Sequence, residues 1–184
     1  MRKIRKWPPM KAYLEPLLHP CDNSLIAKRV RLSSFDHPYH FHPEIEITFI
    51  AKSSGTRVIG DHIGSFQAGE LYILGANVPH VFRNTLCPAG GAEAEVLQFQ
   101  GERMHGFPEA RGFNRLLDRS DSGMVFDCAT SERGARLMRQ IRQTKGVLRL
   151  PGIGFALHGS RDQTEHNEIF PVNRTELSPD HSMR

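Results

Sequence analysis

Three histidines and two glutamates lie close together in one short stretch, HPYHFHPEIEI, at residues 37–47. Side chains alternate across an extended strand, so His40, His42 and Glu46 are expected to share one face. This expectation requires the backbone to stay extended through Pro43. Imidazole and carboxylate groups on one face could bind a metal ion or line a polar pocket.

A further histidine, His80, opens the segment HVFRN directly after the turn GANVP. In an antiparallel barrel, this strand could bring His80 across the interior to the first cluster. Three imidazoles and one carboxylate are suitable ligands for Zn, Ni, Fe or Mn, and such sites leave coordination positions open for water or substrate. The sequence therefore predicts a candidate site for one divalent transition metal, with the ligands His40, His42, Glu46 and His80.

The same pattern also has a plainer interpretation, which stays open. Histidines at the mouth of a barrel can hydrogen-bond the backbone or line a polar pocket without holding a metal. The other histidines, His37, His62 and His105, are expected at the surface. The sequence has no GxSxG, glycine-rich phosphate loop or HExxH motif that would offer a competing site.

Short strands separated by turn residues must position these side chains between residues 24 and about 100. SLIAKRVRL places on one face Leu25, Ala27 and Arg29, and on the other Ile26, Lys28 and Val30. IEITFIA places on one face Ile45, Ile47 and Phe49, and on the other Glu46, Thr48 and Ile50. The turn SSG at 53–55, followed by TRVIG, predicts a β-hairpin. Six or seven short strands at this spacing predict an all-β sandwich or small barrel.

Helical spacing replaces the strand pattern after residue 100. GFNRLLDRS and SERGARLMRQIRQT are predicted helices, the second with Ser131 as its N-cap and an apolar face of Ala135, Met138 and Ile141. VLRLPGIGFALHG is a weaker third candidate because its proline and glycines oppose a helix. Four arginines form an i, i+3 stripe that we interpret as a solvated helix face: Arg133, Arg136, Arg139 and Arg142.

These motifs together carry a resemblance to a known family. The segment HFHPEIEITFIAKSSGTRVIGDHIGSFQAGELYILGANVPHVFRN resembles the first half of AraC-type transcription regulators with an N-terminal cupin sensor domain. The shared features are HxHPExE, the GTRxxGD return, the FxxGEL step and the GxNxPH turn, in this order. The resemblance covers roughly residues 10–100, and residues 101–150 more loosely. Two departures from the wider cupin pattern, the late Gly55 and the missing PxG step before His80, weaken any transfer of cupin enzyme chemistry.

The resemblance implies a mainly β fold, namely a cupin double-stranded β-helix, or jelly-roll barrel, followed by two or three α-helices. The implied divisions are an N-terminal extension (1–22), the cupin barrel (23–105), a helical linker and dimerisation segment (106–158) and a polar tail of disordered composition (159–184). The family's C-terminal helix-turn-helix domain is not expected here, because the tail lacks an apolar-periodic helix pair. DNA would then be a partner only through that absent domain.

Composition sets broader limits. The chain has 184 residues, 39% of them hydrophobic, and a net charge of +4. The N-terminal segment lacks the apolar core of a signal peptide, and no apolar run approaches the ~20 residues of a membrane span, so a cytoplasmic location without membrane contact is expected. Cys21, Cys87 and Cys128 are odd in number and far apart, which favours reduced thiols over disulfides.

Three functions remain in view. The first is the ligand-sensing, homodimerising cupin domain of an AraC-type regulator, with a small effector in a pocket lined by His40, His42, Glu44, Glu46, Arg57 and His80. Arg57 could pair with an acidic effector or lie on the barrel surface. The second is a small metal-dependent cupin enzyme, such as a dioxygenase or isomerase, with Glu44 or Glu46 as a base. The third is a module that dimerises with full-length regulators. The first is preferred, with no catalytic residue assigned.

Overall fold

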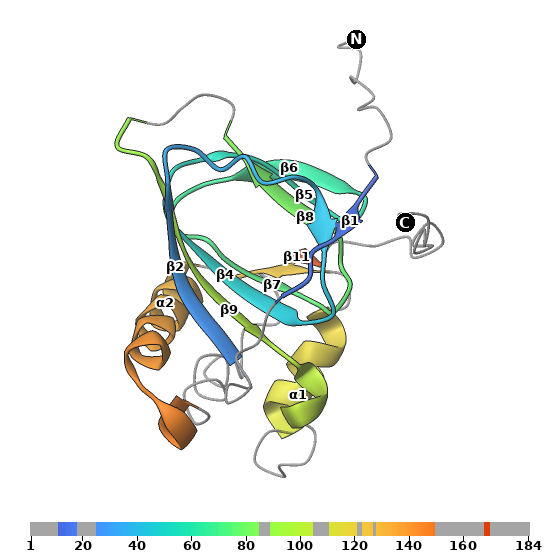
Figure 1. The fold of residues 1–184 in the computed structure, drawn as a ribbon, viewed down its shortest axis with the longest axis vertical. Helices are drawn as coiled ribbons and strands as arrows, with labels where there is room; N and C mark the ends of the chain where they lie inside the picture. Colours follow the sequence, from blue (N-terminus) through green and yellow to red (C-terminus); the bar gives the residue numbers. More distant parts are fainter. Residues whose placement is uncertain are drawn as a thin grey trace.

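Two β-sheets face each other in the computed structural model, which describes residues 11–17, 25–84, 89–104, 111–120, 123–126, 128–149 and 168–169 (Figure 1). The first sheet has the strand order β1 (Tyr13–Leu14), β3 (His40–Phe41), β8 (His80–Arg83), β5 (Gly55–Ile59), β6 (His62–Phe66). The second has the order β11 (Glu168–Ile169), β10 (Met124–Val125), β7 (Leu71–Leu74), β4 (Ile45–Lys52), β9 (Ala92–Phe99), β2 (Leu25–Leu32). Strands that follow one another along the chain repeatedly lie in opposite sheets, as in a jelly roll.

Alternation along the strands of the second sheet creates two hydrophobic cores, one on each side of it. On β4, Ile45, Ile47 and Phe49 face the helices, as the sequence predicted, and Ile50 faces the first sheet. The outer core adds from the helices Phe113, Leu117, Ala135, Met138 and Ile141. The inner core, between the sheets, contains Phe35, Ile50, Ile59, Phe66, Tyr72, Leu74, Val78, Ala92, Ala94 and Val96. The period-2 pattern thus reports correctly which residues share a face.

Two α-helices cover the outer face of the second sheet (Figure 1). They are α1 (Arg111–Arg119) and α2 (Cys128–Gln143), preceded and followed by the short 3-10 helices η1 (Gly101–Met104) and η4 (Gly146–Arg149). Both predicted helices are confirmed. The third candidate begins as η4, and the rest of it lies outside the described residues. No helix of the described residues is long and apolar enough to cross a membrane.

The predicted hairpin of residues 45–59 is wrong. Strand β4 pairs with β7 and β9, whereas β5 pairs with β6 and β8 in the other sheet. The turn crosses between sheets and is held by Asn84, whose amide donates to the Ser54 carbonyl at 2.7 Å. A Cβ at Gly55 would lie 2.1 Å from the Arg83 carbonyl oxygen, so the close approach of β5 to β8 requires glycine here.

The start of the second predicted helix also needs correction. Helix α2 begins at Cys128, three residues before the expected N-cap. Ser131 is buried inside the first turn, where its hydroxyl donates to the Phe126 carbonyl and accepts from the Leu71 amide, both at 3.2 Å. The serine therefore ties the helix to β7 instead of capping it.

The arginine stripe on α2 is solvated only in part. Arg133, Arg136 and Arg139 are exposed. Arg142 instead pairs with Glu95 on β9, with Nε 3.0 Å from Oε2. One end of the stripe thus anchors the helix to the sheet.

The fold class predicted from the sequence is confirmed: a mainly β, two-sheet jelly roll followed by helices. The proposed division into segments remains a prediction. Most of 1–22 and 159–184 lies outside the described residues, as do Cys21, Cys87 and His105. Within the polar tail, β11 pairs with β10.

Candidate functional site

Three histidines and a glutamate converge between the two sheets. The chain bends at residues 42–44 and passes from one sheet to the other, so His40 lies on β3 and Glu46 on β4 of the opposite sheet. The expected continuous strand through Pro43 is therefore wrong, which agrees with the lack of a backbone donor at proline. The bend nevertheless brings the predicted side chains together.

His80 joins the cluster through strand pairing and a tight turn. Strand β8 runs antiparallel to β3, and His40 and His80 are direct cross-strand partners. The preceding turn has Asn77 at φ 60°, and the Asn77 amide donates to the His42 carbonyl at 2.8 Å. The centroid of the His80 ring lies 4.3 Å from that of the His40 ring and 5.2 Å from that of the His42 ring.

Each of the three imidazoles is held by the same kind of hydrogen bond. In each ring, Nδ1 donates to a backbone carbonyl two residues away. His40 donates to Pro38 at 2.9 Å, His42 to Glu44 at 3.1 Å and His80 to Val78 at 2.9 Å. A carbonyl can only accept, so each Nδ1 carries the proton, and in the neutral ring the lone pair lies on Nε2. One ring nitrogen from each of the three lies within 4.8 Å of the others.

Glu46 is the buried acidic partner of this cluster. Its carboxylate accepts from Gln98 Nε2 at 2.7 Å and from the Thr48 hydroxyl at 2.5 Å, and lies 3.2 Å from His42 Nε2. Burial raises the pKa of Glu46, but the hydrogen bond from His42 and the nearby imidazoles outweigh it and hold the pKa far below its usual range. Glu46 is therefore an anion.

The imidazoles respond to burial in different ways. Burial lowers the pKa of His42, but its hydrogen bond and ion pair with Glu46 reverse the effect, so this pKa is raised overall. Burial lowers the pKa of His80 to about 4, and lowers that of His40. Near neutral pH, His42 can thus share a proton with Glu46 while His80 is neutral.

These residues fit a divalent metal. Nε2 of His80 is buried, makes no hydrogen bond within the described residues, and lies 3.8 Å from Glu46 Oε1. A neutral imidazole lone pair facing a buried carboxylate is unfavourable unless a cation lies between them. Three backbone-oriented imidazoles and one carboxylate form a donor set suited to Zn, Ni, Fe or Mn.

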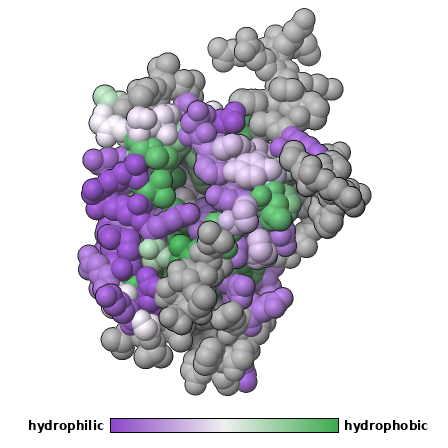
Figure 2. Space-filling model, viewed as in Figure 1, coloured by the Kyte–Doolittle hydropathy of each residue, from purple (hydrophilic) through white to green (hydrophobic). Residues whose placement is uncertain are grey.

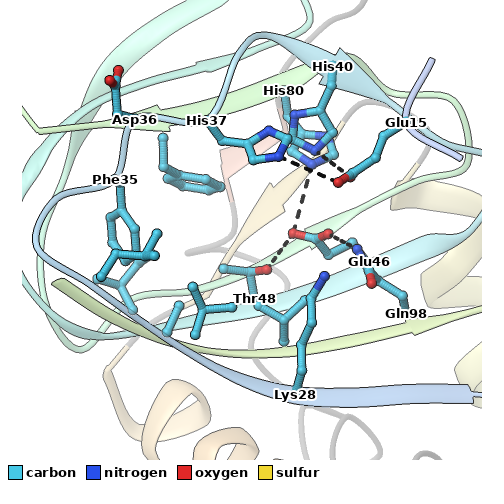
Figure 3. A pocket seen from close by; sticks show the side chains of 16 residues that line it. Glu15, Lys28, Phe35, Asp36, His37, His40, Glu46, Thr48, His80 and Gln98 are labelled. Carbon is cyan, nitrogen blue, oxygen red and sulfur yellow. Dashed lines mark hydrogen bonds and ion pairs between the residues drawn. The ribbon is translucent and has the colours of Figure 1, made fainter. Parts of the chain in front are cut away.

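A cavity of about 150 Å³ opens beside the cluster and continues between the sheets (Figure 3). Figure 2, drawn in the same view as Figure 1, shows small groups of hydrophobic residues between hydrophilic ones on the side of the molecule that faces the viewer. Of the predicted pocket residues, His40, Glu46 and His80 line the cavity. Lys28, Thr48 and Gln98 line it too, from β2, β4 and β9, and were not expected. Thr48 could have been predicted, because it lies two residues after Glu46 on the same strand and so faces the same side.

The N-terminal segment adds a second carboxylate. Strand β1 runs parallel to β3, and Glu15, just beyond it, places Oε2 3.3 Å from His40 Nε2 and Oε1 3.5 Å from His37 Nε2. Tyr13 also contacts His37, with its hydroxyl 3.2 Å from Nδ1. His37 is exposed, as expected, but lines the cavity mouth. Nothing in the local sequence signals this pairing, because it depends on distant residues.

Three predicted pocket residues lie elsewhere. His42 is buried behind the cavity wall, within the histidine cluster but not among the cavity-lining residues, and Glu44 is buried beside it, with Oε2 3.7 Å from His42 Nδ1. Arg57 is neither on the surface nor in this cavity. Its guanidinium donates to the Ser65 carbonyl and lies 5.5 Å from the centre of the Tyr72 ring.

Comparison with known proteins identifies similar structures but no similar sequence. No protein-family model and no curated protein matches the chain. ToxT from Vibrio cholerae O395, bound to (E)-4-(8-methylnaphthalen-1-yl)but-3-enoic acid, matches with a TM-score of 0.53 and 11% identity, over 84% of this chain and 62% of that one. Unsaturated fatty acid bound ToxT from strain SCE256 matches with a TM-score of 0.50 and 13% identity, over 78% and 54%.

An oxalate decarboxylase, OxdC of Bacillus subtilis in mutant form, matches less well, with a TM-score of 0.33 and 20% identity over 42% of this chain and 21% of that one. At these identities the similarities show the fold alone. Over the matched residues the chain shares the fold of ToxT. It spans 54–62% of the ToxT chains to which it is similar.

Proposed function

We propose that this chain is the effector-binding domain of an AraC-type transcription regulator, with a small molecule bound between the sheets. The observation that carries the proposal is the cavity beside His40, Glu46 and His80, inside a fold shared with ToxT. Two of the ToxT structures hold small acids, a fatty acid and a naphthalenyl butenoic acid. Regulation rather than catalysis is the simplest use of such a cavity in this fold.

The second sheet connects this cavity to the helices. Its strands carry cavity residues on the inner face, such as Lys28 and Gln98, and helix contacts on the outer face, such as Glu95 with Arg142. A ligand that binds one arrangement of the sheet more tightly would shift how α2 lies against it. Helix α2 would also form the interface of a homodimer, and DNA would be contacted through a separate domain.

The proposal is tested by screening small effectors and then measuring two responses. A compound that raises the thermal midpoint is expected to change amide hydrogen exchange in α2 and the association state measured by light scattering. Ligand binding that leaves both α2 exchange and association unchanged would contradict a sensing role. The matched control is the same compound with the Thr48→Val variant, whose altered cavity wall should weaken the response.

A metal-dependent cupin enzyme is the second candidate, and the convergence of one ring nitrogen from each of three histidines favours it. A bound divalent metal would act as a Lewis acid toward a substrate oxygen. His40, His42, His80 and Glu46 would hold it. Gln98 and Thr48 would keep Glu46 oriented and ionised, and the apolar cavity wall would exclude water from the substrate.

Metal analysis of untagged protein separates the candidates. Less than about half an equivalent of transition metal per chain would eliminate the enzyme hypothesis, whereas stoichiometric metal is compatible with both functions. Product formation from a panel of small carboxylic and enolic acids by the metal-loaded protein, lost in His80→Ala, would then favour the enzyme over the sensor.

A further inference from the structure

Lys28 is a charged side chain that lines the candidate effector cavity and has no partner among the residues that the structure describes. It extends from the inner face of β2 toward the end of the cavity where Glu46 lies (Figure 3). Within the described residues, no hydrogen bond or ion pair involves its ammonium group. An ammonium group that faces a partly enclosed cavity is stabilised by an anion in that cavity.

The acidic residues of the cavity do not serve as that anion. Glu46 is held by Thr48 and Gln98 and pairs with His42, and Glu15 pairs with His37 and His40. Asp36 is exposed at the rim, and its carboxylate points away from the interior in Figure 3. Lys28 therefore remains available to a ligand.

The rest of the cavity wall changes from polar to apolar along the strands. Cross-strand register places Glu46 opposite Gln98, then Thr48 opposite Val96, then Ile50 opposite Ala94. Val30, two residues beyond Lys28 on β2, is opposite Ala94. Four residues of strand span about 13 Å, so a ligand could place its charged group near Lys28 and an apolar body against Val30, Ile50 and Ala94.

The cavity volume limits the size of that ligand. The cavity measures about 150 Å³. An enclosed apolar cavity of that volume accommodates a molecule the size of benzene. A benzene-sized apolar body therefore fits, with its charged group at the Lys28 end of the open cavity, whereas a long-chain fatty acid would extend beyond this space. Phe35 and Phe82, which also line the cavity, suit an aromatic or short aliphatic body.

We infer that the effector is a small monocarboxylate with a compact apolar body, whose carboxylate pairs with Lys28. This inference rests on the proposed function, since it names the ligand class of the same cavity. It differs from the fatty acid of the ToxT structure in the size of the apolar part.

Calorimetry with matched pairs of ligands tests the inference on the full chain. Benzoate and hexanoate are expected to bind at least 10-fold more tightly than benzamide and hexanamide, because a charge-assisted hydrogen bond contributes about 10- to 100-fold in affinity. Palmitate is expected to bind more weakly than hexanoate. Equal affinity for an acid and its amide would overturn the inference.

Substitutions at Lys28 locate the effect. Lys28→Met is expected to reduce benzoate affinity about 10- to 100-fold and to leave benzamide affinity unchanged. Lys28→Arg should preserve most of the preference for the acid. Lys52→Met, at the exposed end of β4, is the control and should bind benzoate like the unchanged protein. Unchanged benzoate affinity in Lys28→Met would show that the carboxylate binds elsewhere and would overturn the inference. Lys28→Gln is the second variant, used if Lys28→Met fails to fold.

The outcome separates this inference from the proposed function. Preference for acids without any change in α2 hydrogen exchange would support the ligand class and contradict sensing. A neutral or cationic compound that binds and changes α2 exchange would support sensing and overturn the ligand class.

Discussion

The three imidazoles of His40, His42 and His80 form the candidate metal site. Their Nδ1 atoms donate to backbone carbonyls two residues away, which orients each ring from its own backbone. Such outer hydrogen bonds orient metal-ligating histidines and raise their basicity. At the residue scale, the backbone therefore orients the three rings of the candidate metal site, with Glu46 as the anionic partner.

Replacing His80 tests the metal site directly. His80→Ala is expected to lower the affinity for Zn or Mn by at least about 10- to 100-fold, because loss of even an outer hydrogen-bond partner of a ligand has that effect. Titration calorimetry and metal analysis provide the measurement. His62→Ala, a histidine on β6 of the same sheet, is the control. Equal metal content in both variants would mean that His80 is not a ligand.

The pH dependence of stability tests the same residue without metal. The pKa of His80 is about 4 in the folded protein and about 6.5 when unfolded. The unfolded state thus binds more protons between these values, so the free energy of unfolding should fall as the pH decreases from 6.5 to 4, by roughly 3 kcal/mol at most. The lowered pKa of His40 acts in the same direction.

His42 does not cancel this effect. Its raised pKa contributes stability that is already complete at pH 6.5 and below, and that is lost only as the pH rises above 6.5 through the folded pKa. Urea denaturation of metal-free protein at several pH values is the measurement. The His80→Gln variant should show a shallower decrease between pH 6.5 and 4. The same steep decrease in that variant would assign the proton uptake to other groups.

Helix α2 is attached to the second sheet by charge as well as by packing. Glu95 is buried on β9, with a side chain 3% exposed, and it pairs with Arg142 at 3.0 Å and with Arg29 at 3.7 Å. Removing one partner of a buried carboxylate leaves its charge less well compensated. The helix contributes the arginine that the carboxylate needs.

Arg142→Met is accordingly expected to lower the free energy of unfolding by about 1–3 kcal/mol. The loss is limited because Arg29 still compensates part of the Glu95 charge. Arg139→Met, an exposed position on the same helix, should change it by less than about 0.5 kcal/mol. Urea denaturation measures both. Adding Glu95→Gln to Arg142→Met should restore part of the loss, and strictly additive losses would show that the two residues are not coupled.

The whole molecule is organised around one shared sheet. The second sheet contributes Ile47, Leu71 and Leu97 to the outer core, and Ile50, Leu74 and Val96 to the inner core. Loss of either core would expose one face of the same strands. Barrel and helices are therefore expected to unfold together.

Met138→Ala tests this shared stability from the helix side. The residue is 1% exposed in the outer core, so the substitution is expected to lower the free energy of unfolding by about 2–5 kcal/mol. Hydrogen exchange should increase in the first sheet, at β5 and β8, as well as in α2. Increased exchange confined to α2 would show that the barrel is stable on its own.

Local patterns in the sequence determined which residues share a face of each strand and helix. The alternation of Ile45, Glu46, Ile47 and Thr48 specifies two faces of one strand, because side chains alternate whatever the strand pairs with. The spacing of Ala135, Met138 and Ile141 likewise specifies the buried side of a helix. The jelly-roll class and the histidine cluster could be predicted from such patterns together with the resemblance.

Only the tertiary structure decided which strands pair and which side chains meet. Residues 53–54 look like a hairpin turn, but β4 and β5 lie in different sheets, because pairing depends on strands distant in sequence. The same holds for Glu15 beside His40 and for Lys28 inside the cavity. A strand sequence shows that Lys28 and Arg29 face opposite ways, but the sheet that packs against it decides which of them is enclosed.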